Sequence, residues 1–175
     1  MFQSAEGASI CQMCFSGRYQ DLAGSSSCKD CGKGKYLRTA LSVQDHASAD
    51  KCIVCPNGFF NENTGQDFCT GCPIGTINNG NVQMPDAALH DSSEDCEFCE
   101  EGRFSGELNA TGNCLVCPEG FFSRDENERF RCDACAAGTY MASPGTHGVE
   151  SCVVCLGGRY TGTSGSAGCD DCGAG

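Results

Sequence analysis

The sequence is short of tryptophan, proline and positive charge. It has no Trp, five Pro, and 11 Lys and Arg against 23 Asp and Glu, a formal net charge of −12. Phosphate contacts need clustered basic residues, so this composition excludes nucleic acid as a partner and argues against an anionic membrane surface. No stretch reaches the roughly 20 apolar residues of a membrane helix, so we predict no membrane insertion in this segment.

A single large hydrophobic core is also missing. Hydrophobic residues reach 39% only when cysteine is counted, and 24 residues are glycine. No helical periodicity is visible in the sequence. Chains that cannot bury enough apolar surface are usually held together by disulfides or metals.

Cysteine is abundant, and its arrangement is regular. All 18 cysteines stand in Cys-x-x-Cys pairs. The nine pairs are Cys11/Cys14, Cys28/Cys31, Cys52/Cys55, Cys69/Cys72, Cys96/Cys99, Cys114/Cys117, Cys132/Cys135, Cys152/Cys155 and Cys169/Cys172. Cysteine at this density is typical of an oxidising compartment, which predicts an extracellular or cell-surface protein.

Each pair is followed by a glycine in the same register and then, two residues later, usually by an aromatic residue. We call these the turn glycine and the aromatic position. The glycines predict a turn with positive φ or a close backbone approach. The bulky residues predict one side chain that covers the cysteine staple as the core of each unit. They are Tyr19, Tyr36, Phe60, Ile77, Phe104, Phe122, Tyr140 and Tyr160.

The repeats group into larger blocks. Cys52-Ile-Val-Cys-Pro-Asn-Gly-Phe-Phe is nearly repeated at Cys114-Leu-Val-Cys-Pro-Glu-Gly-Phe-Phe. We therefore expect units 1–2 at 11–51, three-unit blocks at 52–113 and 114–168, and truncated units at 1–10 and 169–175. The start has no signal-peptide pattern, so we expect a window on a longer chain.

Two or three β-forming residues follow each turn glycine, and another short strand leads into the next pair. This pattern predicts a small disulfide-rich fold of tandem β-hairpin units with little or no helix. We expect the units to stack into an elongated rod, each contacting mainly its nearest neighbours.

Three chemistries use Cys-x-x-Cys: a disulfide scaffold, tetrahedral zinc and a redox-active dithiol. A zinc site with four thiolate ligands needs two Cys-x-x-Cys pairs, so the odd number of nine pairs would leave one pair without a site. A redox enzyme has one reactive pair on a βαβ framework. We favour the scaffold, expect no metal or other cofactor, and retain zinc as an alternative.

The pattern resembles the cysteine-rich repeats of the ephrin-receptor-like family and, more loosely, tumour-necrosis-factor-receptor modules. The resemblance spans Phe2 to Gly175. Its motifs are Cys55-Pro-Asn-Gly-Phe-Phe, Cys72-Pro-Ile-Gly-Thr-Ile, Cys117-Pro-Glu-Gly-Phe-Phe and Cys135-Ala-Ala-Gly-Thr-Tyr. Pro follows the second Cys in only three of the nine units, which is a departure from the family pattern.

The resemblance implies that the Cys before each turn glycine closes onto the next Cys downstream. The implied ladder is Cys14–Cys28, Cys31–Cys52, Cys55–Cys69, Cys72–Cys96, Cys99–Cys114, Cys117–Cys132, Cys135–Cys152 and Cys155–Cys169. Cys11 and Cys172 would then pair with missing neighbours. A competing register joins first with first and second with second, as in Cys11–Cys28, and sequence alone leaves both open.

Other candidate sites are few. His46, His90 and His147 fall one per long unit and suggest equivalent loops more than a metal or pH site. The acidic run from Asp91 to Glu101 suggests a solvated face more than a Ca²⁺ site. Asn109-Ala-Thr111 is the one N-glycosylation sequon, so a glycan on Asn109 is expected there.

Two repeats carry a second aromatic beside the first, with another nine residues later: Phe59 with Phe68, and Phe121 with Phe130. The two phenylalanines of each repeat can pack against each other within their unit. Alternatively, the four can form a surface for assembly. No catalytic motif is present, so we predict no enzyme activity.

The resemblance implies a segment of a large extracellular protein that builds a surface filament, flagellar hair or wall-like fibre, as in surface proteins of algae and other protists. Its partners would be other copies of itself or other extracellular structural proteins. The alternative is the stalk or ligand-binding ectodomain of a cell-surface receptor or adhesion protein.

Overall fold

The computed structural model describes residues 12–38, 43–79, 86–110, 112–125 and 128–174. The chain divides into two compact units. Unit 1 comprises Met1–Cys72 and Asn78–Cys96, and unit 2 comprises Pro73–Ile77 and Glu97–Gly175. The three-unit blocks expected at 52–113 and 114–168 stay a sequence-based prediction.

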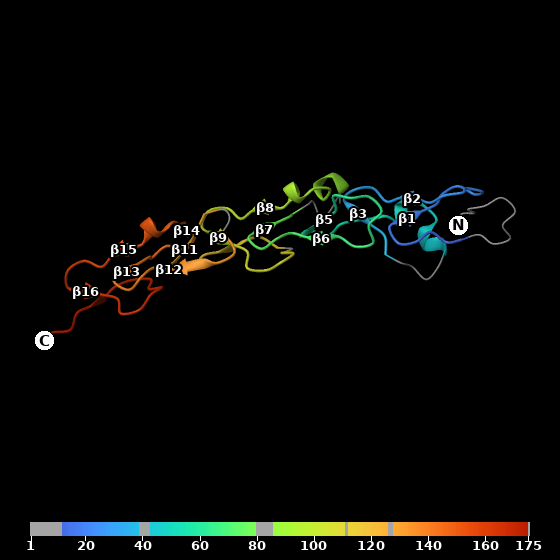
Figure 1. Ribbon diagram of the computed structural model, residues 1–175. Helices are drawn as coiled ribbons and strands as arrows, with labels where there is room; N and C mark the ends of the chain where they lie inside the picture. Colours follow the sequence, from blue (N-terminus) through green and yellow to red (C-terminus); the bar gives the residue numbers. More distant parts are fainter. Residues whose placement is uncertain (1–11, 39–42, 80–85, 111, 126–127, 175) are drawn as a thin grey trace. The chain divides into compact units, whose positions relative to one another are not determined.

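Short antiparallel hairpins make up almost all of the regular structure (Figure 1). In unit 1 the strands are β1 (Arg18–Tyr19), β2 (Lys29–Asp30), β3 (Lys35–Tyr36), β4 (Ile53–Val54), β5 (Phe59–Phe60) and β6 (Thr70–Gly71). In unit 2 they are β7 (Thr76–Ile77), β8 (Glu97–Phe98), β9 (Arg103–Phe104), β10 (Leu115–Val116), β11 (Phe121–Ser123), β12 (Cys132–Ala134), β13 (Thr139–Tyr140), β14 (Thr146–His147), β15 (Val153–Val154), β16 (Arg159–Tyr160) and β17 (Asp170–Asp171).

The remaining elements are single turns of 3₁₀ helix in the longer loops. Unit 1 contains η1 (Val43–His46), η2 (Ala49–Lys51), η3 (Ala87–Leu89) and η4 (Ser93–Asp95), and unit 2 contains η6 (Val149–Ser151). The predicted small disulfide-rich fold of tandem hairpins with little helix is therefore confirmed.

Eight disulfides close eight repeats, and we number the repeats by them. They are Cys14–Cys28, Cys31–Cys52, Cys55–Cys69, Cys72–Cys96, Cys99–Cys114, Cys117–Cys132, Cys135–Cys152 and Cys155–Cys169. This is the ladder register, and it joins Cα atoms 5.6 to 5.9 Å apart. Each bond closes a loop of 14 to 24 residues, which stabilises by roughly 3 kcal/mol in the chain-entropy account.

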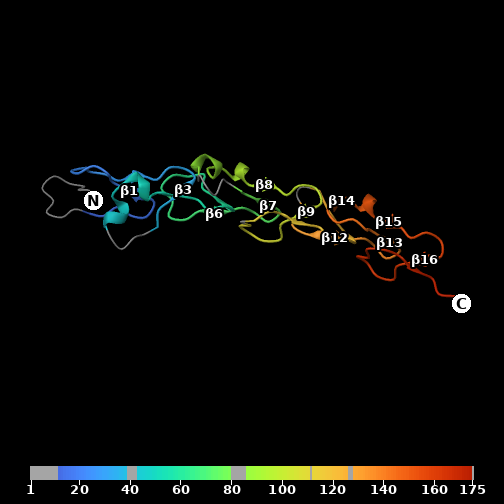
Figure 2. The same ribbon diagram turned by 180° about the vertical axis from the view of Figure 1, so that it is seen from behind.

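The disulfides also set the strand register. The two residues after a turn glycine pair with the two residues between the cysteines of the next pair, as in Arg18↔Asp30 and Tyr19↔Lys29. The second strand therefore lies between the cysteines rather than ahead of them, because the disulfide brings that dipeptide opposite the first strand. Both views of unit 2 show β13 beside β15 in this way (Figures 1 and 2).

A backbone hydrogen bond links every repeat to the one before it. The N–H of each second Cys donates to the carbonyl of the preceding turn glycine, from Cys31 to Gly17 through Cys172 to Gly158, at 2.8 to 3.0 Å. This contact recurs eight times without exception. The start of one repeat is therefore fixed by the turn of the previous repeat.

The turn glycines have positive φ, as predicted, and most of them also meet another backbone. All eight described have φ between 68° and 86°. A Cβ on Gly17, Gly102 or Gly120 would lie 1.9, 1.9 or 2.2 Å from a carbonyl oxygen two repeats ahead. Repeats 1, 5 and 6 thus pack on their second neighbours as well as on the nearest ones, which corrects the expectation of mainly nearest-neighbour contact.

The aromatic position covers the next staple rather than its own. Phe60 of repeat 3 packs on the Cys72–Cys96 disulfide of repeat 4. Phe122 of repeat 6 packs likewise on Cys135 and Cys152 of repeat 7. The expectation of one self-contained core per unit is therefore wrong, since the bond from second Cys to turn glycine places the next disulfide beneath the strand that carries the aromatic ring.

Two glycine variants separate backbone strain from close approach. Gly120→Ala places a methyl 2.2 Å from the Gly165 carbonyl oxygen, whereas Gly138→Ala, at similar φ, meets nothing within 4 Å. Both lose about 1–2 kcal/mol to the left-handed backbone. We expect Gly120→Ala to lose a further ~1–3 kcal/mol, measured by urea unfolding. Equal losses in the two variants would contradict the close packing of repeats 6 and 8.

Candidate functional site

The residue directly after the aromatic position is buried in every repeat, and we call it the joint residue. None of the eight is more than 7% exposed. They are Gln20, Leu37, Asn61, Asn78, Ser105, Ser123, Met141 and Thr161. The sequence signal was present, because this register position never holds a charged residue or a glycine, but the aromatic next to it drew the interpretation.

The joint residue connects its own repeat to both neighbours through the backbone. The Asn61 carbonyl accepts from the Gly34 N–H of the preceding repeat at 2.9 Å, and the Asn61 N–H donates to the His90 carbonyl of the next repeat at 2.8 Å. Leu37, Ser105 and Met141 make the same two bonds. In repeat 6 the side chain of the joint residue takes the place of its carbonyl as the acceptor, since Gly102 N–H donates to the Ser123 hydroxyl at 2.8 Å.

Amide joint residues also fill the interior of their loops. The Asn61 amide donates to the carbonyls of Lys35 and Phe68, each at 3.0 Å. In repeat 1 the Gln20 amide donates to the Ser25 hydroxyl at 2.7 Å and to the Ser27 carbonyl. These bonds satisfy buried polar groups that the short loops cannot pair within a strand.

The three histidines anchor the strand of the repeat before theirs. His46 Nδ1 lies 2.6 Å from the Arg18 carbonyl, and His90 Nδ1 lies 2.9 Å from the Phe59 carbonyl. A carbonyl only accepts, so both rings carry a proton on Nδ1. His147 instead meets the Ser123 hydroxyl at 3.2 Å. They occupy equivalent places in separate repeats, as the equivalent-loop interpretation predicts.

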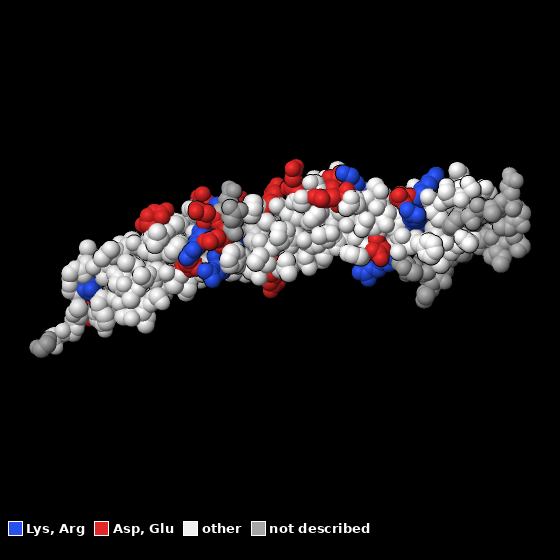
Figure 3. All heavy atoms as spheres, in the orientation of Figure 1, with Lys and Arg blue, Asp and Glu red and all other residues white. Residues whose placement is uncertain are grey.

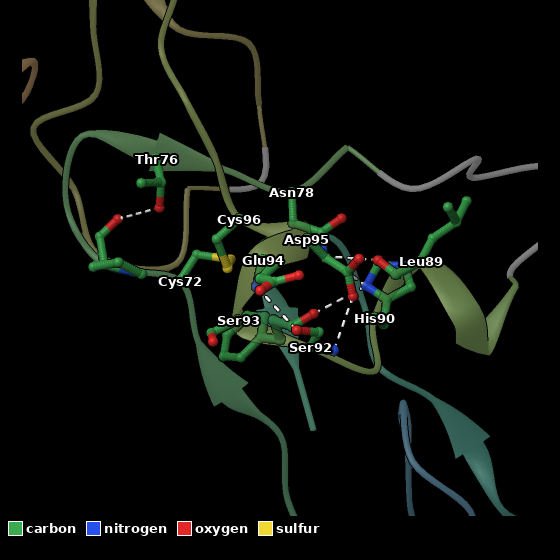
Figure 4. Close-up of a disulfide and its surroundings, with 12 residues drawn as sticks. Cys72, Thr76, Asn78, Leu89, His90, Ser92, Ser93, Glu94, Asp95 and Cys96 are labelled. Atoms are coloured by element: carbon green, nitrogen blue, oxygen red, sulfur yellow. Dashed lines mark hydrogen bonds between the residues drawn. A yellow bond between two sulfur atoms is a disulfide. The ribbon is translucent and has the colours of Figure 1, made fainter. Parts of the chain in front are cut away.

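The close-up of repeat 4 shows how one long loop is held (Figure 4). The Asn78 amide donates to the Leu89 carbonyl at 2.9 Å, next to His90. The Ser92 hydroxyl accepts from Glu94 N–H, and the Asp95 carboxylate accepts from Ser92 N–H, which is a capping box at η4.

Arg129 was not anticipated from the sequence. Its side chain is nearly buried, and its guanidinium donates to the Cys99 carbonyl in the preceding repeat. Gly145 N–H and Gly165 N–H make the equivalent bonds to Cys117 and Cys135, at 2.8 and 2.9 Å. A side chain here replaces a loop glycine, and no residue pattern marks that replacement.

Acidic residues dominate the middle of the chain. Positions 52–102 hold nine Asp and Glu and no Lys or Arg. Figure 3 shows Asp and Glu side chains gathered over the turns η3 and η4. Among the described residues, no group of three His, Cys, Asp or Glu is placed to hold a metal ion.

One acidic side chain bridges two repeats. Glu62 of repeat 3 accepts from both the hydroxyl and the N–H of Ser93 in repeat 4, at 2.5 and 2.9 Å. These two bonds hold the pKa of the Glu62 carboxyl below its ordinary value, and the bond from the Ser93 hydroxyl lowers it more than the bond from the Ser93 N–H.

The four predicted assembly phenylalanines differ in exposure. Phe68 is 62% exposed, whereas Phe59, Phe121 and Phe130 are partly buried. The Phe121 ring lies over Gly165, where a methyl group would meet it at 2.9 Å. The assembly surface stays a prediction, and of its members Phe68 is the most accessible.

A second set of exposed apolar residues recurs in register. Ile53, Leu115 and Val153 each follow the first Cys of a pair directly, and they are 53%, 62% and 52% exposed. Five other described pairs hold a polar residue at this position: Lys29, Thr70, Glu97, Asp133 and Asp170. The apolar members begin β4, β10 and β15, the second strands of their two-stranded hairpins.

The remaining predicted residues lie apart from these contacts. Cys172 is exposed and carries no disulfide, and Cys11 lies outside the described residues. Asn109 lies in a half-exposed turn between β9 and β10. In the described part of the chain, no helix has the length and apolar character needed to cross a bilayer.

Comparison with known families gives one match. The family described as "Tyrosine-protein kinase ephrin type A/B receptor-like" matches residues 2–47, 42–81 and 102–152. No curated protein matches the chain. Repeats of this family are a non-catalytic module type, typical of extracellular domains.

The Glu62–Ser93 bridge predicts a specific pH dependence. Folding lowers the pKa of Glu62. The bridge therefore contributes its full stabilisation above the pKa of the unfolded chain, about 4.3, and this stabilisation is lost as the pH falls through the pKa of the folded state. NMR titration should place the Glu62 carboxyl below that value, and Ser93→Ala should raise it. Ser92→Ala, which removes the side-chain cap from the Glu94 and Asp95 N–H groups but no bond to Glu62, is the control. An unchanged Glu62 titration in Ser93→Ala would rule out the bridge.

Proposed function

We propose that this chain, which belongs to the ephrin type A/B receptor-like family, is a disulfide-laddered structural segment whose copies contact one another laterally to build an extracellular filament or wall-like assembly. The repeats supply a rigid backbone framework. The residues that the framework leaves exposed supply the contacts between copies.

The observation that carries the proposal is the recurrence of exposed apolar side chains at one register position. Ile53 in unit 1 and Val153 in unit 2 stand directly after a cysteine and are about half exposed. Each lies in a hydrogen-bonded strand between two cysteines, so its side chain is presented to another copy of the chain in a fixed orientation. A regular assembly needs such equivalent contacts at intervals along the chain.

Charge supports the same proposal. Copies with a net charge of −12 repel one another, so contacts should form where charge is sparse. Between positions 134 and 169, which include Val153, Glu150 and Arg159 are the sole charged residues. Phe68, the most accessible of the predicted assembly phenylalanines, offers a further apolar contact in unit 1.

A receptor or adhesion stalk is the second candidate, and family membership itself favours it. A stalk needs the same stapled framework but no contact between copies. Self-association of the purified chain therefore separates the two functions.

We expect the purified, oxidised chain to form concentration-dependent oligomers, seen by analytical ultracentrifugation and electron microscopy. The double variant Ile53→Ser/Val153→Ser should weaken association at least about tenfold, since each contact buries an aliphatic side chain. Phe68→Ser should weaken it further.

The matched control is Lys29→Ser/Asp170→Ser, which changes the same register position in two polar repeats. It should associate like the natural chain. A chain that stays monomeric at high concentration would favour the stalk. Oligomers that are equally strong in the apolar double variant would reject this contact surface.

A further inference from the structure

Repeat 5 contains a surface hollow of about 450 Å³ beside the Asn109 turn. Its walls include Phe104 and Leu115 from the paired strands β9 and β10, and Glu107 and Asn113 from the loop between them. This volume lies within the range of small-ligand sites. The lining of the hollow therefore combines apolar and polar side chains.

The joint residue distinguishes this loop from the loops of repeats 1 and 3. Repeats 1 and 3 have loops of almost the same length, 14 residues against 15, and their loop interiors take the amides of Gln20 and Asn61. Repeat 5 has Ser105 instead, which is too short to reach across. Its hydroxyl makes no hydrogen bond to a described residue of the loop.

Asn109 directly precedes Ala110, which lines the hollow. It is the one described non-glycine residue with positive φ, at 60°, a conformation that Asn tolerates better than most residues. Its side chain makes no hydrogen bond within the described residues, and it belongs to the single Asn-x-Thr sequon of the chain.

We propose that Asn109 carries an N-linked glycan whose first sugars pack in this hollow. The C–H face of a pyranose would lie on Phe104 and Leu115, and the carboxylate of Glu107 would accept from sugar hydroxyls. The sugar takes the place that the Gln20 and Asn61 amides fill in other repeats. It covers Leu115, so the lateral contacts proposed through Ile53 and Val153 are independent of it.

The attachment uses a lipid-diphosphate-linked oligosaccharide as co-reactant, transferred by an enzyme of the secretory pathway. The Asn109 amide nitrogen forms a bond to the sugar C1 and loses one proton. The C1–O bond to phosphate breaks, and the lipid diphosphate leaves with its electron pair. No oxidant or reductant is needed.

The test uses the whole chain secreted from a eukaryotic host and mapped by mass spectrometry. We expect a glycan on Asn109 whose enzymatic release from the native protein is about tenfold slower than after reduction and denaturation. The control variant Gly162→Asn creates the sequon Asn-Thr-Ser in an exposed loop where Gly162 has nothing within 4 Å. Its glycan should be released rapidly from the native protein.

Two variants test the packing itself. Ser105→Asn, which supplies the amide of repeat 3, and Leu115→Ser, which removes one apolar wall, should each speed release of the Asn109 glycan to the control rate. An unmodified Asn109 in a host that modifies the Gly162→Asn control overturns the proposal. So does an Asn109 glycan released as fast as the control glycan from the otherwise natural chain.

Discussion

The structure depends on the position of the second cysteine in each pair. From Cys14 to Cys155 its sulfur closes the repeat ahead, and from Cys31 to Cys172 its N–H donates to the carbonyl of the turn glycine behind, at 2.8 to 3.0 Å. Seven of these cysteines, from Cys14 to Cys135, are at most 2% exposed. Covalent and hydrogen-bonded links therefore meet at one buried residue, and the chain needs no large hydrophobic core.

Cooperation between repeats follows from this arrangement. An aromatic ring such as Phe60 covers the disulfide of the following repeat, and a joint residue such as Asn61 bonds to the repeats on both sides. Neither contact exists in an isolated repeat. Stability is therefore a property of neighbouring repeats together, as in other repeat proteins, although the contacts here also reach the second neighbour.

Much of this fold could be predicted from the sequence, because it is encoded in residue types that have few alternatives. The glycines at positive φ, such as Gly120, leave almost no other choice of residue. The burial of Ser105 or Ser123 is not encoded in the residue type, because serine is usually exposed; its signal in the sequence is the shared register position, which never holds a charged residue or a glycine. Arg129 was missed for a similar reason. Its guanidinium donates to a cysteine carbonyl that receives a glycine N–H in other repeats, and this exchange is visible only in the structure. The exposed Ile53 and Val153 were overlooked because apolar residues between cysteines suggest a core.

The most direct measurement is disulfide mapping of the oxidised, unreduced chain by mass spectrometry with partial reduction. The account predicts links from the second Cys of one pair to the first Cys of the next, such as Cys55–Cys69 and Cys117–Cys132. Links between equivalent members of neighbouring pairs, such as Cys52–Cys69 or Cys114–Cys132, would contradict it, as would zinc bound to free thiols.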